Sequence, residues 1–190
     1  MKKVFLSLVM LITGMTVSAQ EITLTDNGAY EKKIVVQVDS IKSSILYGRA
    51  MEALSDWTGA SGKAQAGIDY NDRDAAIVIY KGHEYIGFKN VFLGDGWERY
   101  ADFILKVKCK DGRAQVTVTI PTITFVHNKN GMKRTYTVSE ILKAVDESKG
   151  KKKERGIAML DDIKGLIESL SIAMSNRLKS ANSVDDDDDF

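Results

Sequence analysis

The sequence predicts an α+β fold in which an antiparallel sheet carries helices on one face. Apolar and polar residues alternate over 100–110 and again over 113–125, and Asp111-Gly112 between these segments is a strong hairpin signal. Apolar residues then recur at spacings of three and four over 160–174, which indicates an amphipathic helix. One strand and one helix precede several strands, and helices follow them. We therefore expect the helices to bury their apolar stripes on one face of the sheet and to leave the other face partly open.

The amino-terminal part of this domain is predicted to hold one strand and one helix. Apolar residues alternate with polar ones over 29–38, as expected for a strand. Apolar residues over 41–57 share one helical face. Asp39 or Ser40 is expected to cap the amino end of that helix by accepting backbone hydrogen bonds.

Further strands are predicted after this helix. The run 75–81 is apolar up to its final lysine, which favours a strand buried on both faces. Gly82-His83 is interpreted as a bend before another strand at 84–88. Pro121 has no backbone N–H to donate to a sheet, so it is predicted to mark a bulge or an edge in the last long strand.

Residues 1–19 have the pattern of a secretory signal peptide. Lys2 and Lys3 give a basic start, the run 4–12 is largely apolar, and small residues precede a predicted cleavage after Ala19. The apolar run is shorter than the ~20 residues that span a bilayer, so a membrane anchor is not favoured. We expect an exported protein, located in the periplasm or outside the cell.

The remaining chain divides by composition into four parts. We expect an α+β sheet domain over 20–148, a basic linker over 149–155, a helix packed on the sheet over 156–180, and an acidic disordered tail over 181–190. The tail holds five consecutive aspartates followed by Phe190, which could be a recognition handle for an envelope partner.

Charge and cysteine content narrow the classes of partner. The formal net charge is +1, and it becomes −1 without the two lysines of the signal segment. A near-neutral chain has no global attraction to nucleic acid or anionic lipid, so nucleic acid is not expected as a partner. Cys109 is the one cysteine, so no disulfide can form within the chain. Its position on the apolar side of its strand predicts a buried, unreactive thiol.

Two strand segments and the last helix resemble a known family. Residues 72–82 and 100–113, the second ending in an Asp-Gly-Arg hairpin, are similar to blocks of the domain of unknown function 4468. Residues 163–174 lie where that family has its last helix, and the resemblance covers roughly 30–179. The resemblance implies a secreted bacterial protein with a TATA-binding-protein-like (TBP-like) fold, which is a curved antiparallel sheet backed by helices. It implies no activity, cofactor or catalytic residue, and the fold name does not imply DNA binding.

The sequence contains no catalytic signature, and its best metal candidate is weak. Asp69, Asn71, Asp72 and Asp74 bring four oxygen-bearing side chains within six residues, as calcium prefers. The distal Glu and the central Gly of a calcium hand are missing. Asp and Asn are also the usual turn formers between strands, which is the interpretation we favour. No metal and no cofactor are predicted.

The two histidines are not accompanied by other residues that would complete a site. His83 stands beside Glu84 at the predicted bend, which indicates a surface pair, and His127 lies in a polar loop.

Aromatic side chains near these strands offer one further possibility, a surface on which a sugar could stack. The residues concerned are Tyr80, Tyr85, Phe88, Trp97 and Tyr100. Core packing and cross-strand pairing are the commoner roles of aromatic residues in strands, and we favour them.

The favoured function is a non-catalytic binding or interaction module of the bacterial envelope, with an unknown envelope protein or glycan as partner. One alternative is a hydrolase of envelope or dietary polymers, with carboxylates drawn from Glu84, Asp95, Glu98 and Asp102. The other is an assembly protein that dimerises through the stripe 160–174. That stripe spans only about two heptads, fewer than a stable coiled coil needs, so a monomer is favoured.

Overall fold

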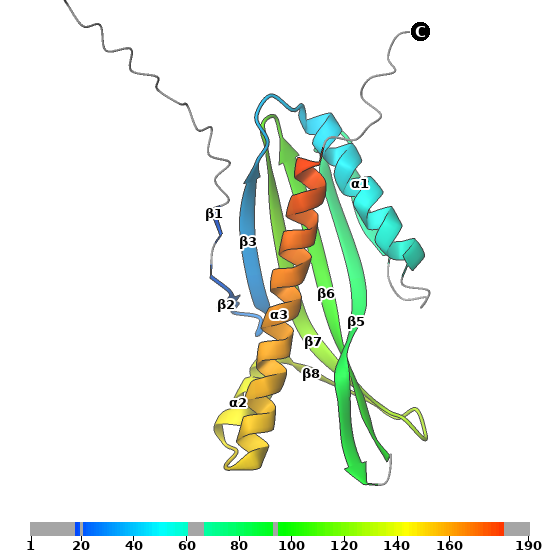
Figure 1. Cartoon of the computed structure of the whole chain (residues 1–190), viewed down its shortest axis with the longest axis vertical. Helices are drawn as coiled ribbons and strands as arrows, with labels where there is room; N and C mark the ends of the chain where they lie inside the picture. Colours follow the sequence, from blue (N-terminus) through cyan, green and yellow to red (C-terminus); the bar gives the residue numbers. More distant parts are fainter. Residues whose placement is uncertain (1–17, 20, 61–66, 93–94, 181–190) are drawn as a thin grey trace, which may run out of the picture.

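The structure is a computed structural model of the full chain, and it describes residues 18–19, 21–60, 67–92 and 95–180 (Figure 1). The predicted acidic tail lies outside the described residues. So does the predicted export signal, apart from Ser18 and Ala19.

One antiparallel sheet forms the body of the molecule, as predicted. Its strands are β1 Ser18–Ala19, β2 Thr23–Leu24, β3 Tyr30–Gln37, β4 Gly67–Asp72, β5 Ile77–Phe92, β6 Asp95–Lys110, β7 Arg113–His127 and β8 Lys133–Thr137. The strand order is β1-β3-β7-β6-β5-β4, with β2 also paired to β3 and β8 also paired to β7. The long strands β5, β6 and β7 curve along the molecule and extend past β3 to the end where β8 pairs with β7 (Figure 1).

The helices are α1 Ser43–Ala60, α2 Val138–Asp146 and α3 Lys151–Lys179. α3 packs over β7 and β3, and α1 packs over β6 and β5 (Figure 1). α2 lies at the other end of the molecule, against β7, β8 and the amino-terminal part of α3. The mixed α+β architecture with helices on one face of the sheet is therefore confirmed.

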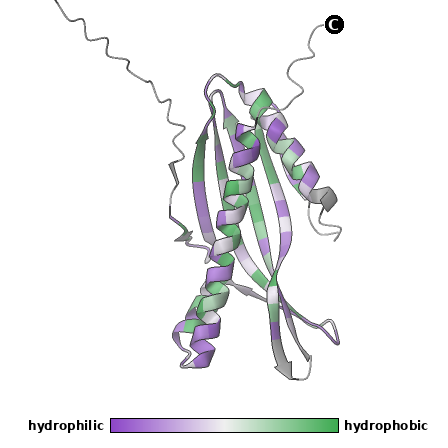
Figure 2. Ribbon diagram, viewed as in Figure 1, coloured by the Kyte–Doolittle hydropathy of each residue, from purple (hydrophilic) through white to green (hydrophobic). Residues whose placement is uncertain are grey.

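The core lies between the sheet and the helices α1 and α3. Hydrophobic and hydrophilic residues alternate along the strands and along α3 (Figure 2). The predicted stripe of α3 is buried at Leu160, Ile163, Ile167 and Met174. Burying such side chains contributes about 1.5–3 kcal/mol each, so this stripe holds α3 on the sheet and is not an exposed dimer surface.

The opposite face of the sheet is polar. Side chains that alternate with the core residues point away from the helices, and they are exposed or half-buried. They include Lys33, Lys106, Lys108, Gln115, Thr117 and Thr119. Alternate residues of a strand point to opposite sides, so the strand pattern produced this polar face.

The predicted basic linker at 149–155 is wrong over most of its length. α3 begins at Lys151, because Lys, Glu and Arg are good helix formers and Glu154 lies favourably in the first turn. Gly150, at φ 55°, separates α3 from α2. The two helices then touch at Gly156, where an added Cβ would lie 2.4 Å from a methyl carbon of Val145.

The predicted bend at Gly82-His83 is also wrong, because β5 continues through both residues. Gly82 is explained by the lack of room for a side chain at this position. A Cβ on Gly82 would lie 2.2 Å from the ring of Phe103 on the neighbouring strand. A glycine inside a strand often marks such a close approach.

The amino end of α1 is held by a residue that the local sequence did not suggest. The helix starts at Ser43, beyond the expected caps Asp39 and Ser40. The carboxylate of Asp111, in the turn between β6 and β7, accepts a hydrogen bond from the backbone N–H of Ser43 at 2.8 Å. This bond lowers the pKa of Asp111.

Candidate functional site

β7 contains a bulge next to a cleft at the α2 end of the molecule. Ile120 and Pro121 together oppose the single residue Phe103 of β6, which confirms the predicted bulge. The extra residue shifts the alternation, so Ile123 and Phe125 point to the helix side after it. The bulge thus keeps apolar residues of β7 beneath the helices as the sheet bends.

Cross-strand pairs beyond the bulge form the floor of the cleft. Arg99 of β6 pairs with Phe125 of β7, which pairs with Arg134 of β8. Residues opposite each other in antiparallel strands point to the same side, so these three side chains form one row. On β5, Gly87 faces Arg99, and an added Cβ there would lie 2.6 Å from the guanidinium. Gly87, at φ 129°, therefore makes room for the arginine.

A neighbouring row adds Lys89 and Trp97 to the floor. Lys89 of β5 pairs with Trp97 of β6, which pairs with His127 of β7. The Trp97 and His127 rings meet edge to face with centroids 4.9 Å apart. The guanidinium of Arg134 lies over the Trp97 ring, 5.2 Å from its centroid.

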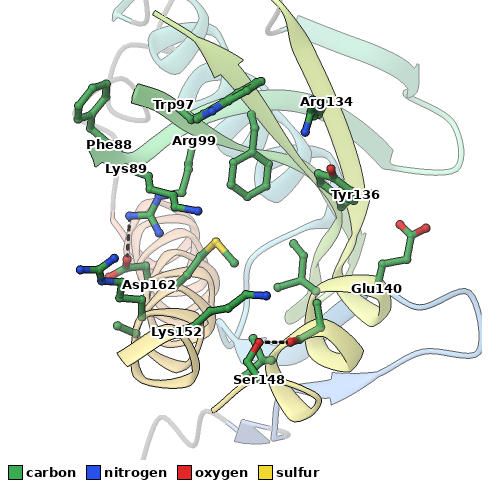
Figure 3. Close-up of a pocket in the computed structure, with 18 residues that line it drawn as sticks. Phe88, Lys89, Trp97, Arg99, Arg134, Tyr136, Glu140, Ser148, Lys152 and Asp162 are labelled. Atoms are coloured by element: carbon green, nitrogen blue, oxygen red, sulfur yellow. Dashed lines mark hydrogen bonds and ion pairs between the residues drawn. The ribbon is translucent and has the colours of Figure 1, made fainter. Parts of the chain in front are cut away.

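The helices α2 and α3 form the wall of the cleft, which has a volume of about 830 Å³ (Figure 3). Its apolar lining includes four aromatic side chains and the smaller residues of the two helices. The aromatic residues are Phe88, Trp97, Phe125 and Tyr136. A volume of this size, with mainly apolar walls and a few polar groups, is typical of a ligand site.

The charge of the lining is predominantly positive. Within the part of the chain that the structure describes, five cationic side chains and two carboxylates line the cleft. The cations are Lys89, Arg99, Arg134, Lys152 and Arg155, and the carboxylates are Glu140 and Asp162. Lys152 and Arg155 belong to the first turns of α3, where the helix dipole adds to the positive field.

The two carboxylates of the cleft already have partners. Asp162 lies 3.8 Å from the guanidinium of Arg99, a long contact drawn as a dashed line in Figure 3. The Nε atom of Arg99 is buried and has no hydrogen-bond partner among the described residues. Glu140 accepts the backbone N–H of Thr137 at 2.7 Å within the capping box of α2, which lowers the pKa of Glu140. The Nε donor of Arg99 is therefore unsatisfied but shielded from solvent, and the cleft lining is completed by the rest of its guanidinium.

A second polar cluster lies on the open face of the sheet, around His83. The Nδ1 atom of His83 lies 2.6 Å from a carboxylate oxygen of Asp102. The other oxygen of Asp102 accepts hydrogen bonds from the hydroxyls of Thr122 at 2.8 Å and Thr124 at 3.0 Å. The His83 ring stacks on Tyr100 with centroids 4.6 Å apart. The predicted pairing of His83 with Glu84 is wrong, because successive residues of a strand point to opposite faces.

The weak calcium candidates do not converge. Asp69 forms an ion pair with Lys81 at 3.0 Å, and Asp72 accepts the backbone N–H of Ala75 at 2.9 Å in the following turn. That hydrogen bond lowers the pKa of Asp72. Asn71 lies in β4 and Asp74 in the turn. Among the described residues, no three His, Cys, Asp or Glu side chains come close enough to hold a metal ion.

The carboxylates suggested for a hydrolase are not gathered in the cleft. Glu84 is exposed on β5, and Asp95 begins β6. Glu98 accepts a hydrogen bond from the Tyr100 hydroxyl at 2.6 Å, which raises the pKa of Tyr100 to about 12. Glu98 and Asp102 are four residues apart on one strand, about 13 Å at the rise of a β-strand. This separation is wider than either spacing used by paired-carboxylate glycosidases.

The five aromatic residues suggested as a sugar surface are divided among three places. Tyr80 is buried in the core. Tyr85 and Tyr100 pair on the open face, with centroids 5.6 Å apart. Phe88 and Trp97 line the cleft.

Cys109 is buried in the core, as predicted, at 4% exposure. Burial raises the pKa of its thiol to about 11.

Sequence reasoning did not find the cleft. Arg134, Tyr136, Lys152 and Arg155 carried no motif, and the last two were assigned to the linker. The pairing of β7 with β8, which follows from the His127-to-Met132 turn, is a signal that could have revealed Arg134 and Tyr136.

Comparison with known families matches this fold to a described domain. The family model of the domain of unknown function DUF4468, with TBP-like fold, matches residues 33–124. Residues 33–124 thus resemble the DUF4468 family, as the strand segments 72–82 and 100–113 predicted. The strand order, the curved open sheet and the helices on one face agree with the TBP-like fold that the DUF4468 resemblance implied.

Two solved structures share this DUF4468 fold at low sequence identity. A DUF4468 family protein from Bacteroides ovatus has a TM-score of 0.64 and 14% identity, over 85% of this chain and 92% of that one. A TBP-like protein from Parabacteroides distasonis has a TM-score of 0.57 and 12% identity, over 83% of this chain and 97% of that one. No match was found among curated proteins. Within the described residues, no helix is long and apolar enough to cross a membrane.

Proposed function

We propose that this protein is an exported, non-catalytic binding module of the bacterial envelope. Its ligand occupies the cleft between the β5–β8 strands and the helices α2 and α3, and it carries a negative group joined to an apolar or aromatic part. The observation that carries this proposal is the lining itself, in which four aromatic side chains are combined with five cations.

The chemistry of the ligand follows from how these side chains are held. Arg134 lies over the Trp97 ring, so the guanidinium is fixed by a cation–π contact with its edge available for an anion. Arg99 has a buried Nε without a partner among the described residues and a long contact to Asp162. A carboxylate, sulfonate or phosphate would accept hydrogen bonds from the exposed guanidinium of Arg134, and such bonds are stronger when both partners are charged. The aromatic side chains would cover the apolar part of the ligand.

A binding role is supported over acid–base catalysis by the state of the two carboxylates in the cleft. Glu140 has a lowered pKa because it caps α2, so it stays ionised and cannot serve as a general acid near neutral pH. Asp162 pairs with Arg99.

The export part of the proposal rests on the basic, apolar and small-residue pattern of residues 1–19. Mass spectrometry of the protein from cell fractions tests it. A mature amino terminus at Gln20 in the periplasm or medium is expected, whereas a cytoplasmic chain that retains Lys2 and Lys3 would contradict export.

The binding part is tested with two fluorescent probes that differ in one charge. Anilinonaphthalene sulfonate is anionic, and phenylnaphthylamine is its neutral analogue. The cleft is expected to bind the sulfonate more tightly, and the Arg134→Ala variant should lose this preference while it still binds the neutral probe. Lys108→Ala, which removes an exposed cation on the opposite face, is the matched control. Equal affinities for both probes, or an equal loss in the control, would refute the proposed ligand chemistry.

A further inference from the structure

We propose that the acidic segment Asp185–Phe190 of one copy of this chain occupies the cleft of a second copy. This inference rests on the proposed function, because it names a partner for the same cleft. Its evidence is the match between the segment's composition and the cleft lining, together with the length of chain available to reach the cleft.

The segment has the two chemical features that the cleft requires. It carries five carboxylates in a row and then one aromatic ring. The cleft offers five cations, against two carboxylates that are already paired. Charge-assisted hydrogen bonds between Arg or Lys and carboxylates are the strong ones in proteins, and the Phe190 ring can pack against the aromatic floor.

The position of the segment favours a second copy over the same molecule. The carboxyl end of α3 lies at the opposite end of the molecule from α2 and the cleft (Figure 1). From Asp162, which lines the cleft, to Ser180 there are 18 residues of helix, about 27 Å at 1.5 Å per residue. The ten residues 181–190 span at most about 36 Å when fully extended. Within one molecule only the last few residues could reach the near edge of the cleft, and the chain would have to be almost straight.

The contact between two copies is head to tail. Each copy contributes its segment at one end and its cleft at the other, so the two surfaces differ and the contact repeats from copy to copy. The association is therefore expected to increase with protein concentration. It should weaken as salt screens the exposed charges, because the Debye length falls to about 3 Å at 1 M ionic strength.

The direct test uses a peptide with the sequence 183–190 and a receptor that lacks a competing segment. The receptor is the full chain with Asp185–Asp189 all replaced by Asn. The unlabelled peptide, titrated into the receptor in a calorimeter, should bind saturably, and replacing the peptide's five aspartates by asparagine should abolish binding. Arg134→Ala in the receptor should weaken binding roughly tenfold, since a lost hydrogen bond to a charged group has that effect. Lys108→Ala on the opposite face should leave it unchanged.

Sedimentation of the full chain provides the second readout. The native chain should associate with increasing concentration at low salt, and the five-asparagine chain should remain monomeric. A native chain that stays monomeric while its segment cross-links to its own cleft would refute the second-copy inference. A receptor that binds anilinonaphthalene sulfonate at the cleft but not the peptide would refute the inference and leave the proposed function standing. Binding of neither would refute both.

Discussion

The guanidinium of Arg134 lies over the indole ring of Trp97, with its central carbon 5.2 Å from the ring centroid. The two residues come from β8 and β6, which are separated by β7 in the sheet. This pair combines a cation and an aromatic ring, the two kinds of side chain that characterise the cleft lining. The contact also links β6 to β8 across β7. The cation–π contact itself stabilises by only about 0.5–1 kcal/mol at an exposed site.

Replacing Arg134 by Ala is therefore expected to affect binding much more than stability. The free energy of unfolding, measured by urea denaturation, should fall by about 1 kcal/mol or less. Lys133→Ala, an exposed neighbour whose side chain points to the other face of β8, should change neither stability nor affinity for an anionic probe. A fall of several kcal/mol in the Arg134 variant would indicate a structural role for this residue.

Two glycines of α3 should respond in opposite ways to the same substitution. An added Cβ on Gly156 would lie 2.4 Å from a methyl carbon of Val145, so Gly156→Ala should push α2 away from α3 and destabilise by about 1–3 kcal/mol. At Gly165 no atom of the described residues lies within 4 Å of an added Cβ. Gly165→Ala should stabilise by about 0.5–1 kcal/mol, because alanine is the better helix former. Thermal and urea unfolding of both variants checks the prediction, and equal effects would contradict the α2–α3 contact.

The hydrogen bond from Ser43 to Asp111 predicts a pH dependence of stability. The folded-state pKa of Asp111 is lowered from 3.8, so its ionised form stabilises the fold above that pH. This contribution is lost as pH falls through the lowered pKa. Asp111→Asn keeps the turn chemistry with Gly112 but removes the charge, so its stability deficit should be present at pH 7 and shrink in acid.

Asp39→Asn is the matched control for Asp111→Asn, since Asp39 was expected to cap α1 and is exposed. It should show no such pH-dependent deficit. A larger effect at Asp39 than at Asp111 would reverse the assignment of the cap.

Cys109 should be unreactive in the folded protein. Its thiol pKa is raised to about 11 by burial, and only the thiolate reacts with aromatic disulfide reagents. At pH 8 the thiolate fraction should be roughly a hundredfold lower than in the unfolded chain. Labelling rates in buffer and in guanidinium measure this directly, and similar rates would contradict a buried Cys109.

The parts of the fold that follow from local periodicity were predictable from the sequence. The alternation over 100–110 and 113–125 predicted β6 and β7, and the stripe 160–174 predicted which face of α3 is buried. Pro121 predicted the bulge, because proline has no N–H to donate to a neighbouring strand, whichever strand that is. Each of these signals is contained in a short stretch of chain.

The cleft was not predictable, because its residues come together only through strand register and helix placement. Arg99, Phe125 and Arg134 form one row only when β6, β7 and β8 pair as they do. Lys152 and Arg155 have no apolar pattern, so charge alone suggested a linker where α3 begins. The partner of His83 was missed for the same reason, since Asp102 lies 19 residues away on the next strand.

The central claim, that the cleft binds an anionic ligand with an apolar part, is tested most directly by the emission of Trp97. The chain has two tryptophans, and Trp57 packs in the core against Tyr80, outside the cleft. In a Trp57→Phe chain, adding anilinonaphthalene sulfonate should change Trp97 emission saturably with one ligand bound per chain. The Trp97→Phe chain, which keeps Trp57, should not give that response. An unchanged Trp97 signal at saturating probe, or the same response from Trp57, would contradict the account.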